Sequence, residues 1–298
     1  MSSVWIGDTE IILTGTLVRY ALVAPECYEL VRDPESLARG IVKQGHHVDL
    51  LIYGQRLPDI APKHRHYMEW DEIAALRVTT YDHWITKQII KENKKNIAKA
   101  EKRGISVAEA SYDDDFVAGI VDIYNESPIR QGKAFTHYRK DPETVRRENG
   151  TYPDRSLFIG AYWEGRLIGF VKLFLTSGCA STMQVISKIE HRDKKPTNAL
   201  LAKAVEICSA RGIPFLQYGG WSDGTLGDFK RYNGFERMQI PLYYVPASMK
   251  GRIVLRLKLH HGIKQIMPDA AWTAMKNVRK RITDFRYAFP GDRGGSSS

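Results

Sequence analysis

The sequence contains little cysteine. Its 298 residues include Cys27, Cys179 and Cys208, an odd number without a Cys-x-x-Cys pair. A disulfide framework and a zinc site are therefore not indicated. The nine histidines show no ligand spacing either, so we expect no metal. Cys208 falls on the apolar side of an expected helix and is predicted to lie in the core.

Long hydrophobic runs are also missing. No stretch approaches the roughly 20 apolar residues of a membrane span. The first residues are interrupted by Asp8, Glu10 and Arg19 and lack the apolar centre of a signal peptide. We therefore expect a cytoplasmic protein. Glycine patterns of the dinucleotide or Walker type are absent as well, so the commonest phosphate-binding loops are not indicated.

What the sequence does contain is enough apolar material for a large core and an excess of basic residues. It is 43% hydrophobic, and its formal charge is +10. Residues 250–290 hold ten Lys/Arg against two Asp, and a second basic cluster lies at residues 87–103. Such surfaces attract tRNA, CoA phosphates, acidic glycans or anionic lipid, although a solvated basic surface has the same composition.

The most informative stretch is residues 187–235. An alternating strand ends in a basic turn at residues 191–195, and an amphipathic helix follows and stops near Gly212. The first N–H groups of a helix lack internal partners and carry the positive end of its dipole, so this order can bind an anion. A solvated basic turn fits the turn alone equally well. The candidate phosphate-binding residues are Arg192, Lys194 and Lys195, which add full charges, together with His191, Thr197 and Asn198.

The chain before this stretch is expected to begin with a small α/β segment, residues 1–81. Strands are predicted at 16–23, 26–31, 47–53 and 67–78, with a helix from Pro34 to near Gly45. Residues 82–104 are predicted as one basic linking helix that begins at Asp82 and ends at Gly104.

Residues 105–259 follow the order β-α-α-β-β-β-α-β-α-β-β, which predicts an α/β (α+β) domain with a mixed central sheet. A hairpin is expected across Gly165. The final two strands are expected at 235–245 and 253–259. Residues 260–290 are predicted as a basic amphipathic helix that docks by its apolar stripe, and 291–298 as a disordered tail.

This order resembles the GNAT superfamily of N-acyltransferases. The segments 91–104 and 201–212, and Gly224-Thr225-Leu226…Phe229-Lys230 followed by Gly234-Phe235, look like its FemABX branch of aminoacyl-tRNA-dependent peptidyl transferases. The resemblance implies a GNAT-like acyl-CoA N-acyltransferase fold whose N-terminal GNAT-like half is shortened. It also implies that the donor pyrophosphate lies at residues 191–198, although Lys195-Pro196-Thr197 replaces the family's Arg/Gln-x-x-Gly-x-Gly/Ala pattern.

The implied activity is transfer of an acyl or aminoacyl group, from acyl-CoA or aminoacyl-tRNA, to an amine. The resemblance implies that Lys230 faces the reacting carbonyl, at a position where many GNAT acetyltransferases have a tyrosine. In the long polar and aromatic loop 127–138, His137 or Tyr138 can accept the amine proton. The expected acceptor-binding residues are Arg130, Lys133, Phe135 and Trp221; Trp221 can also be a core residue.

A second interpretation is a non-catalytic module that keeps the fold and binds tRNA or another polyanion. The acceptor in the first interpretation is an amine of a small molecule, a peptide or a glycan precursor, which the sequence does not distinguish. The basic side of residues 268–286 can meet tRNA or a membrane surface, and a solvated surface is the simpler expectation.

Overall fold

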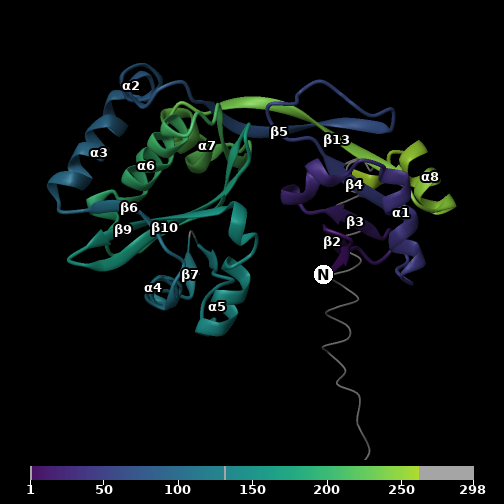
Figure 1. Cartoon of the computed structure of the whole chain (residues 1–298), viewed down its shortest axis with the longest axis horizontal. Helices are drawn as coiled ribbons and strands as arrows, with labels where there is room; N and C mark the ends of the chain where they lie inside the picture. Colours follow the sequence, from purple (N-terminus) through teal and green to yellow (C-terminus); the bar gives the residue numbers. More distant parts are fainter. Residues whose placement is uncertain (1, 131, 262–298) are drawn as a thin grey trace, which may run out of the picture. The chain divides into compact units, whose positions relative to one another are not determined.

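The computed structural model describes residues 2–130 and 132–261 (Figure 1). They form two compact units. Of the described residues, the smaller unit contains 2–24, Val31–Ile52 and Tyr244–His261; the larger contains Pro25–Leu30 and Tyr53–Tyr243. The predicted helix within residues 260–290 lies, except for its first two residues, outside the described residues, as does the predicted tail.

The smaller unit is built on a short sheet. Strands β1 (Ser2–Ile6), β2 (Thr9–Thr14) and β3 (Tyr20–Val23) are antiparallel, and β4 (Leu50–Gly54) pairs with β3 in parallel. The connection from β3 to β4 contains α1 (Pro34–Lys43), which begins where Asp33 accepts a hydrogen bond from the Ser36 amide. The predicted helix at Pro34 is therefore confirmed.

Two short strands were predicted wrongly. Residues 26–31 fall largely in a 3-10 helix, η1 (Pro25–Leu30), and residues 253–259 lie in and after helix α8 (Met249–Arg256). The run Ile253-Val254-Leu255 has the composition of a strand. However, Ser248 caps the helix by accepting from the Gly251 amide, and the buried residues of α8 are Gly251, Val254 and Leu255, which have the i, i+3, i+4 spacing of one helix face.

The larger unit carries a mixed sheet with the strand order β13-β5-β12-β11-β10-β9-β6. Strands β11 and β12 are parallel, whereas β12–β5, β11–β10, β10–β9 and β9–β6 are antiparallel. The expected hairpin is confirmed, because Glu164 and Gly165 both have positive φ, as a tight two-residue turn requires. The strands are β5 (Tyr67–Arg77), β6 (Ser106–Ala110), β9 (Ser156–Trp163), β10 (Arg166–Leu175), β11 (Ala180–Ser187), β12 (Phe215–Gly220) and β13 (Glu236–Pro246).

Helices cover both faces of this sheet (Figure 1). On one face α6 (Pro196–Ala210) buries its apolar side against Val171 and Leu173 of β10. On the other, α4 (Asp114–Asn125) packs on Phe170, and α5 (Pro142–Asn149) lies against α4. Alternate residues of β10 therefore serve two separate cores, as the pleat of a strand requires.

The predicted helix over residues 82–104 is interrupted. It consists of α2 (Tyr81–His83), a π-helical turn η2 (Trp84–Gln88) and α3 (Lys91–Lys102), with extended backbone at Ile90. The cap is Thr80 rather than Asp82, since its side chain accepts from the His83 amide. The interruption lets the end of α7 (Gly224–Tyr232) bond to both pieces: the Trp84 indole donates to Asn233 O at 2.9 Å, and the Ile90 amide donates to Tyr232 O.

Cys27, Cys179 and Cys208 are buried, and no disulfide joins any two of them. Within residues 2–130 and 132–261, no group of three or more His, Cys, Asp or Glu side chains is placed to hold a metal. In the same part of the chain, no helix has both the length and the apolarity needed to cross a bilayer.

Candidate active site

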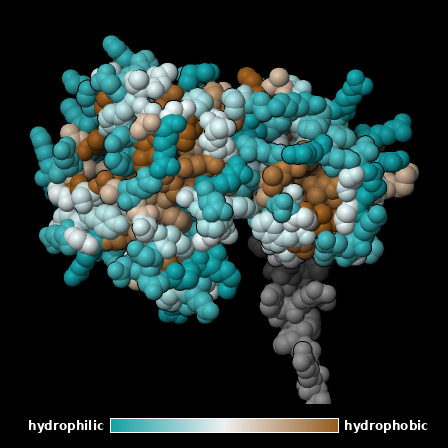
Figure 2. Space-filling view, in the orientation of Figure 1, coloured by the Kyte–Doolittle hydropathy of each residue, from teal (hydrophilic) through white to brown (hydrophobic). Residues whose placement is uncertain are grey.

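The two parallel strands of the larger sheet separate soon after they meet. Strand β11 pairs with β12 only at Ala180–Leu216 and Ser181–Gln217. Beyond these pairs β12 has an irregularity between Gln217 and Gly220, where Gly219 adopts a positive φ of 60°. Backbone groups of β11 after Ser181 that face away from β10 therefore have no partners on β12. We call this separation of the two strands the wedge; Figure 2 shows hydrophobic surface in the area of α6 and α7, the helices next to these strands.

Helix α6 begins beside the end of β11. Lys195, in the left-handed region at φ 62°, precedes Pro196, and no side chain caps the helix. Ser187 of β11 and Thr197 of α6 are joined through their hydroxyls at 2.9 Å. Asn198 is 7% exposed, yet its Nδ2 donor has no hydrogen-bond partner in the described residues. A buried donor without a partner is costly, so this helix end is suited to an acceptor such as a phosphate oxygen.

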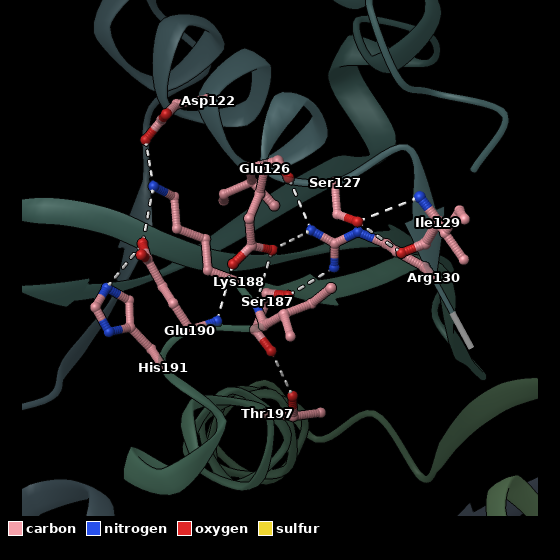
Figure 3. Close-up of polar contacts among 12 residues, drawn as sticks. Asp122, Glu126, Ser127, Ile129, Arg130, Ser187, Lys188, Glu190, His191 and Thr197 are labelled. Carbon is pink, nitrogen blue, oxygen red and sulfur yellow. Dashed lines mark hydrogen bonds and ion pairs between the residues drawn. The ribbon is translucent and has the colours of Figure 1, made fainter. Parts of the chain in front are cut away.

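The chain just before the basic turn is held by a carboxylate of the protein itself. The Glu126 carboxylate, at the end of α4, accepts hydrogen bonds from the amides of Ile189 (2.7 Å) and Glu190 (2.9 Å), as Figure 3 shows. Arg130 Nη2 donates to the same carboxylate at 2.8 Å. Glu126 therefore holds the two residues that directly precede the basic turn.

The basic residues of the turn divide into two pairs. His191 and Lys194 pack on Trp163: the imidazole lies 5.0 Å from the indole, and Lys194 Nζ lies 4.4 Å above it. Arg192 is exposed and Lys195 is half-buried, and neither forms an ion pair within the described residues. Arg192 and Lys195 are therefore the cations of the turn that can meet an incoming anion.

Lys230 is buried at the end of the wedge. Its side chain, on α7, is 3% exposed; Nζ donates to Gly220 O of β12 at 2.6 Å and lies 5.2 Å from the Tyr218 ring. Burial lowers the pKa of Lys230, and no carboxylate pairs with it in the described residues. Gly227 allows α7 to approach the backbone of Ser222 closely, because a Cβ at this position would lie 1.9 Å from Ser222 O.

Three of the expected acceptor-side residues gather around Tyr124 of α4. The rings of Phe135 and His137 lie 5.7 and 4.7 Å from the Tyr124 ring, and Arg130 stacks on Phe135 at 4.9 Å. Burial lowers the pKa of His137, and the charge of Lys140 adds to this while Glu148 opposes it. Lys140 Nζ lies 3.1 Å from His137 Nδ1, and because an ammonium can only donate, this nitrogen is the acceptor of that hydrogen bond. No contact among the described residues joins Lys230 to this cluster.

Arg130 also stabilises the loop that carries it. Its Nη1 donates to Ser187 O at 2.8 Å, and its Nη2 donates to Ile123 O and Glu126 (Figure 3). Nε is left without a partner among the described residues. Burial is the main cause of the lowered pKa of Arg130; the charge of Arg192 contributes and Glu126 opposes it.

The remaining expected residues lie outside the cluster around Tyr124. Lys133 is exposed on β8 (Lys133–Ala134), which pairs with β7 (Ile129–Arg130). Tyr138 is half-buried under Arg139. Trp221 donates its amide to Glu72 O at 2.7 Å and packs on the same core as α6, which is the core role left open by the sequence.

Sequence reasoning missed several polar residues on the acceptor side of the sheet. Tyr124 OH donates to Gln184 of β11 at 2.7 Å and accepts from Asn149 at 3.4 Å. Lys172 of β10 is 2% exposed and donates to Thr151, and burial lowers its pKa to about 8. The alternation of β10 and β11 places Lys172 and Gln184 on the α4 face, but the sequence does not indicate their partners.

Three solved structures resemble the chain over most of its length. FemX has a TM-score of 0.57 at 9% identity, covering 83% of this chain and 86% of its own. The C-terminal domain of a putative lysylphosphatidylglycerol synthetase from Agrobacterium fabrum has a TM-score of 0.52 at 11% identity, covering 85% of each chain. L-PGS from Bacillus licheniformis has a TM-score of 0.52 at 13% identity, covering 85% of this chain and 86% of its own.

The chain has the fold of FemX and of these two synthetase structures. The expected fold class is therefore confirmed. No family model and no curated protein matches the sequence. In this GNAT/FemX-like fold, β11 and α6 are the strand and helix on either side of residues 191–195, and the wedge opens beside them.

Proposed function

We propose that the protein is an N-acyltransferase that moves an aminoacyl group from aminoacyl-tRNA to an amine acceptor. The observation that carries the proposal is the wedge between β11 and β12, bordered by the uncapped start of α6 and by the buried ammonium of Lys230. Such a separation can admit the aminoacyl ester of the donor between the two strands, while the phosphates of the tRNA stay outside.

The phosphate side of the donor is assigned to the start of α6. Arg192 and Lys195 supply charge, and the Thr197 hydroxyl and the unpartnered side-chain Nδ2 of Asn198 supply hydrogen-bond donors. His191 and Lys194, packed on Trp163, keep the turn basic and fixed. The donor carbonyl then enters the wedge, where backbone groups of β11 lack strand partners.

The chemistry requires little beyond positioning and charge. The neutral amine attacks the ester carbonyl, a C–N bond forms, and the developing oxyanion is stabilised by Lys230. The C–O bond to the ribose then breaks; the ribose oxygen gains a proton and the amine loses one. In this proposal His137 accepts the amine proton at Nδ1 in place of its contact with Lys140, and Arg130 and Phe135, which pack beside the imidazole, orient the acceptor.

Charge next to the site favours tRNA over CoA. Helix α3 packs beside α6, and Arg103 at its end pairs with Asp193 in the basic turn at 3.2 Å. The exposed cations of α3 extend the basic surface beyond the length of a CoA pyrophosphate. In addition, Pro196 has no backbone N–H, so the turn has one donor fewer for a pyrophosphate. These exposed cations are Lys91, Lys94, Lys95, Lys102 and Arg103.

Removing the two free cations of the turn should weaken donor binding in a salt-dependent way. Each phosphate contact contributes about 0.7–0.9 to the slope of log K against log salt. The double variant Arg192→Ala/Lys195→Ala is expected to lower that slope by about 1.4–1.8, measured by fluorescence titration of tRNA. The matched variant Arg39→Ala/Lys43→Ala removes equal charge from α1 and should leave the slope unchanged; an equal loss in both variants would contradict the assignment.

Transfer itself is tested with labelled aminoacyl-tRNA and labelled acyl-CoA in parallel reactions. A protein-free pool of cellular amines serves as acceptor, and products are identified by mass spectrometry. We expect a labelled amide from the tRNA reaction. If only acyl-CoA gave product, the protein would still be a transferase, but the assignment of aminoacyl-tRNA as its donor would be wrong. Binding of tRNA without any product would favour the non-catalytic module. The position of the Glu126 carboxylate beside the basic turn is the observation that favours that module.

The pH dependence of transfer should report the charge on Lys230. Because burial lowers its pKa, the ammonium is lost at a lower pH than an ordinary lysine, and the rate should fall on the alkaline side accordingly. Single-turnover rates across pH 7–10 measure this. In Lys230→Arg, whose group stays charged, the alkaline decrease should disappear; an unchanged profile would assign it to another group.

A further inference from the structure

Helix α8 of the smaller unit exposes apolar side chains on its outer face. Met249, Ile253 and Leu257 are spaced four apart, so they lie on one side, and they are 68%, 54% and 58% exposed. Leu17, 76% exposed, lies close by, because Lys250 donates to the Leu17 carbonyl. We call these four residues the α8 ridge.

The opposite side of α8 is fixed to the unit, so the ridge is held outward. Ser248 donates to Asp49 at 2.7 Å, and the Ala247 amide donates to Asp49 O at 2.9 Å. At Gly251 a Cβ would lie 1.9 Å from Asp49 O, so the helix approaches β4 as closely as a glycine allows. Val254 is buried beneath the helix. The exposure of the ridge therefore does not reflect a loosely attached helix.

The charges around the ridge have one sign. Residues 247–261 contain no Asp or Glu, and their cations are Lys250, Arg252, Arg256 and Lys258. Lys250 pairs with Asp49, whereas the other three are exposed and form no ion pair within the described residues. Aliphatic side chains flanked by cations fit a surface that is apolar within and anionic outside, which is the interface of an acidic lipid bilayer.

We propose that the α8 ridge docks the protein on anionic lipid membranes, with Ile253 at its centre. Charge argues against two other occupants. The chain's own residues 262–298 are predominantly basic, with seven Lys/Arg against three Asp, and a second copy would present the same cations. A nucleic acid would satisfy the charges, but it would leave the four aliphatic side chains exposed to water.

The first test is flotation of the full chain with vesicles of phosphatidylcholine alone or mixed with phosphatidylglycerol. Binding is expected only to the mixed vesicles. Met249→Ser/Ile253→Ser/Leu257→Ser should bind at least tenfold more weakly, whereas Trp70→Ser, which removes an exposed apolar residue from β5, should bind like the parent protein. Equal binding to neutral vesicles, or full binding by the triple variant, would overturn the proposal.

The second test needs one substitution at the surface. The three natural cysteines are buried, so Ile253→Cys supplies the accessible thiol for a maleimide probe. It should react rapidly in the free protein and slowly with phosphatidylglycerol vesicles. Slow reaction without vesicles would indicate cover by residues 262–298 or a second copy, and protection by tRNA instead of vesicles would indicate nucleic acid; each result would overturn the bilayer proposal.

Discussion

Substitution of Lys230 by methionine is expected to lower the single-turnover transfer rate about 10²–10³-fold, the usual effect of removing one oxyanion donor. Methionine fills a similar volume, so the buried site at the base of α7 stays occupied. The ammonium, which now donates to Gly220 O and has no carboxylate partner in the described residues, is the group removed. Quenched-flow measurement at saturating donor isolates this effect from binding.

The matched control is Arg231→Met. Arg231 is the next residue of α7, is half-exposed and pairs with Asp228 one turn earlier, so its loss should change the rate less than twofold. Both variants should melt near the parent protein. A normal rate in Lys230→Met would remove Lys230 from the mechanism, and an equal loss in both variants would show that α7 had been disturbed.

The largest expected loss of stability follows Trp84→Ala. Trp84 is fully buried among residues of β5 and α6, and truncation of such a side chain costs about 3–5 kcal/mol. Its indole also donates to Asn233 O, which is therefore left without that partner. Urea unfolding followed by circular dichroism measures the change in the free energy of unfolding.

Trp84→Phe separates the two contributions. Phenylalanine retains much of the buried surface but has no N–H. The free energy of unfolding is therefore expected to fall by about 1–3 kcal/mol, because the Asn233 carbonyl loses this hydrogen-bond donor. Ile90→Ser, at an exposed position nearby, should cost far less. If Trp84→Ala were no more harmful than Ile90→Ser, the interrupted helix would not be held to α7 in the way described.

Local patterns in the sequence predicted much of the sheet. The alternation of residues 156–175 with Gly165 between the strands gave the hairpin, and the spacing of Leu200, Leu201 and Ala204 gave α6. The errors came from contacts distant in sequence. The break at Ile90 depends on Tyr232 O, and α8 depends on Asp49, so neither could be read from its own segment.

The site was predicted less completely than the fold. The order of strand, basic turn and helix located the start of α6, and the resemblance drew attention to Lys230. The sequence did not indicate that Glu126 would bond to the Ile189 amide, because the two are 63 residues apart. It also missed Tyr124, whose place at the centre of the acceptor cluster depends on packing between α4 and β11.

Hydrogen exchange with and without aminoacyl-tRNA tests directly whether the donor lies in the wedge. Slower exchange is predicted for the end of β11, for the first turn of α6 and for the segment from Tyr218 to Gly220, with no change in α1. Uncharged tRNA should protect the start of α6 and leave β12 unchanged, since it lacks the ester. Protection confined to α3, or the same protection with charged and uncharged tRNA, would contradict a donor ester between β11 and β12.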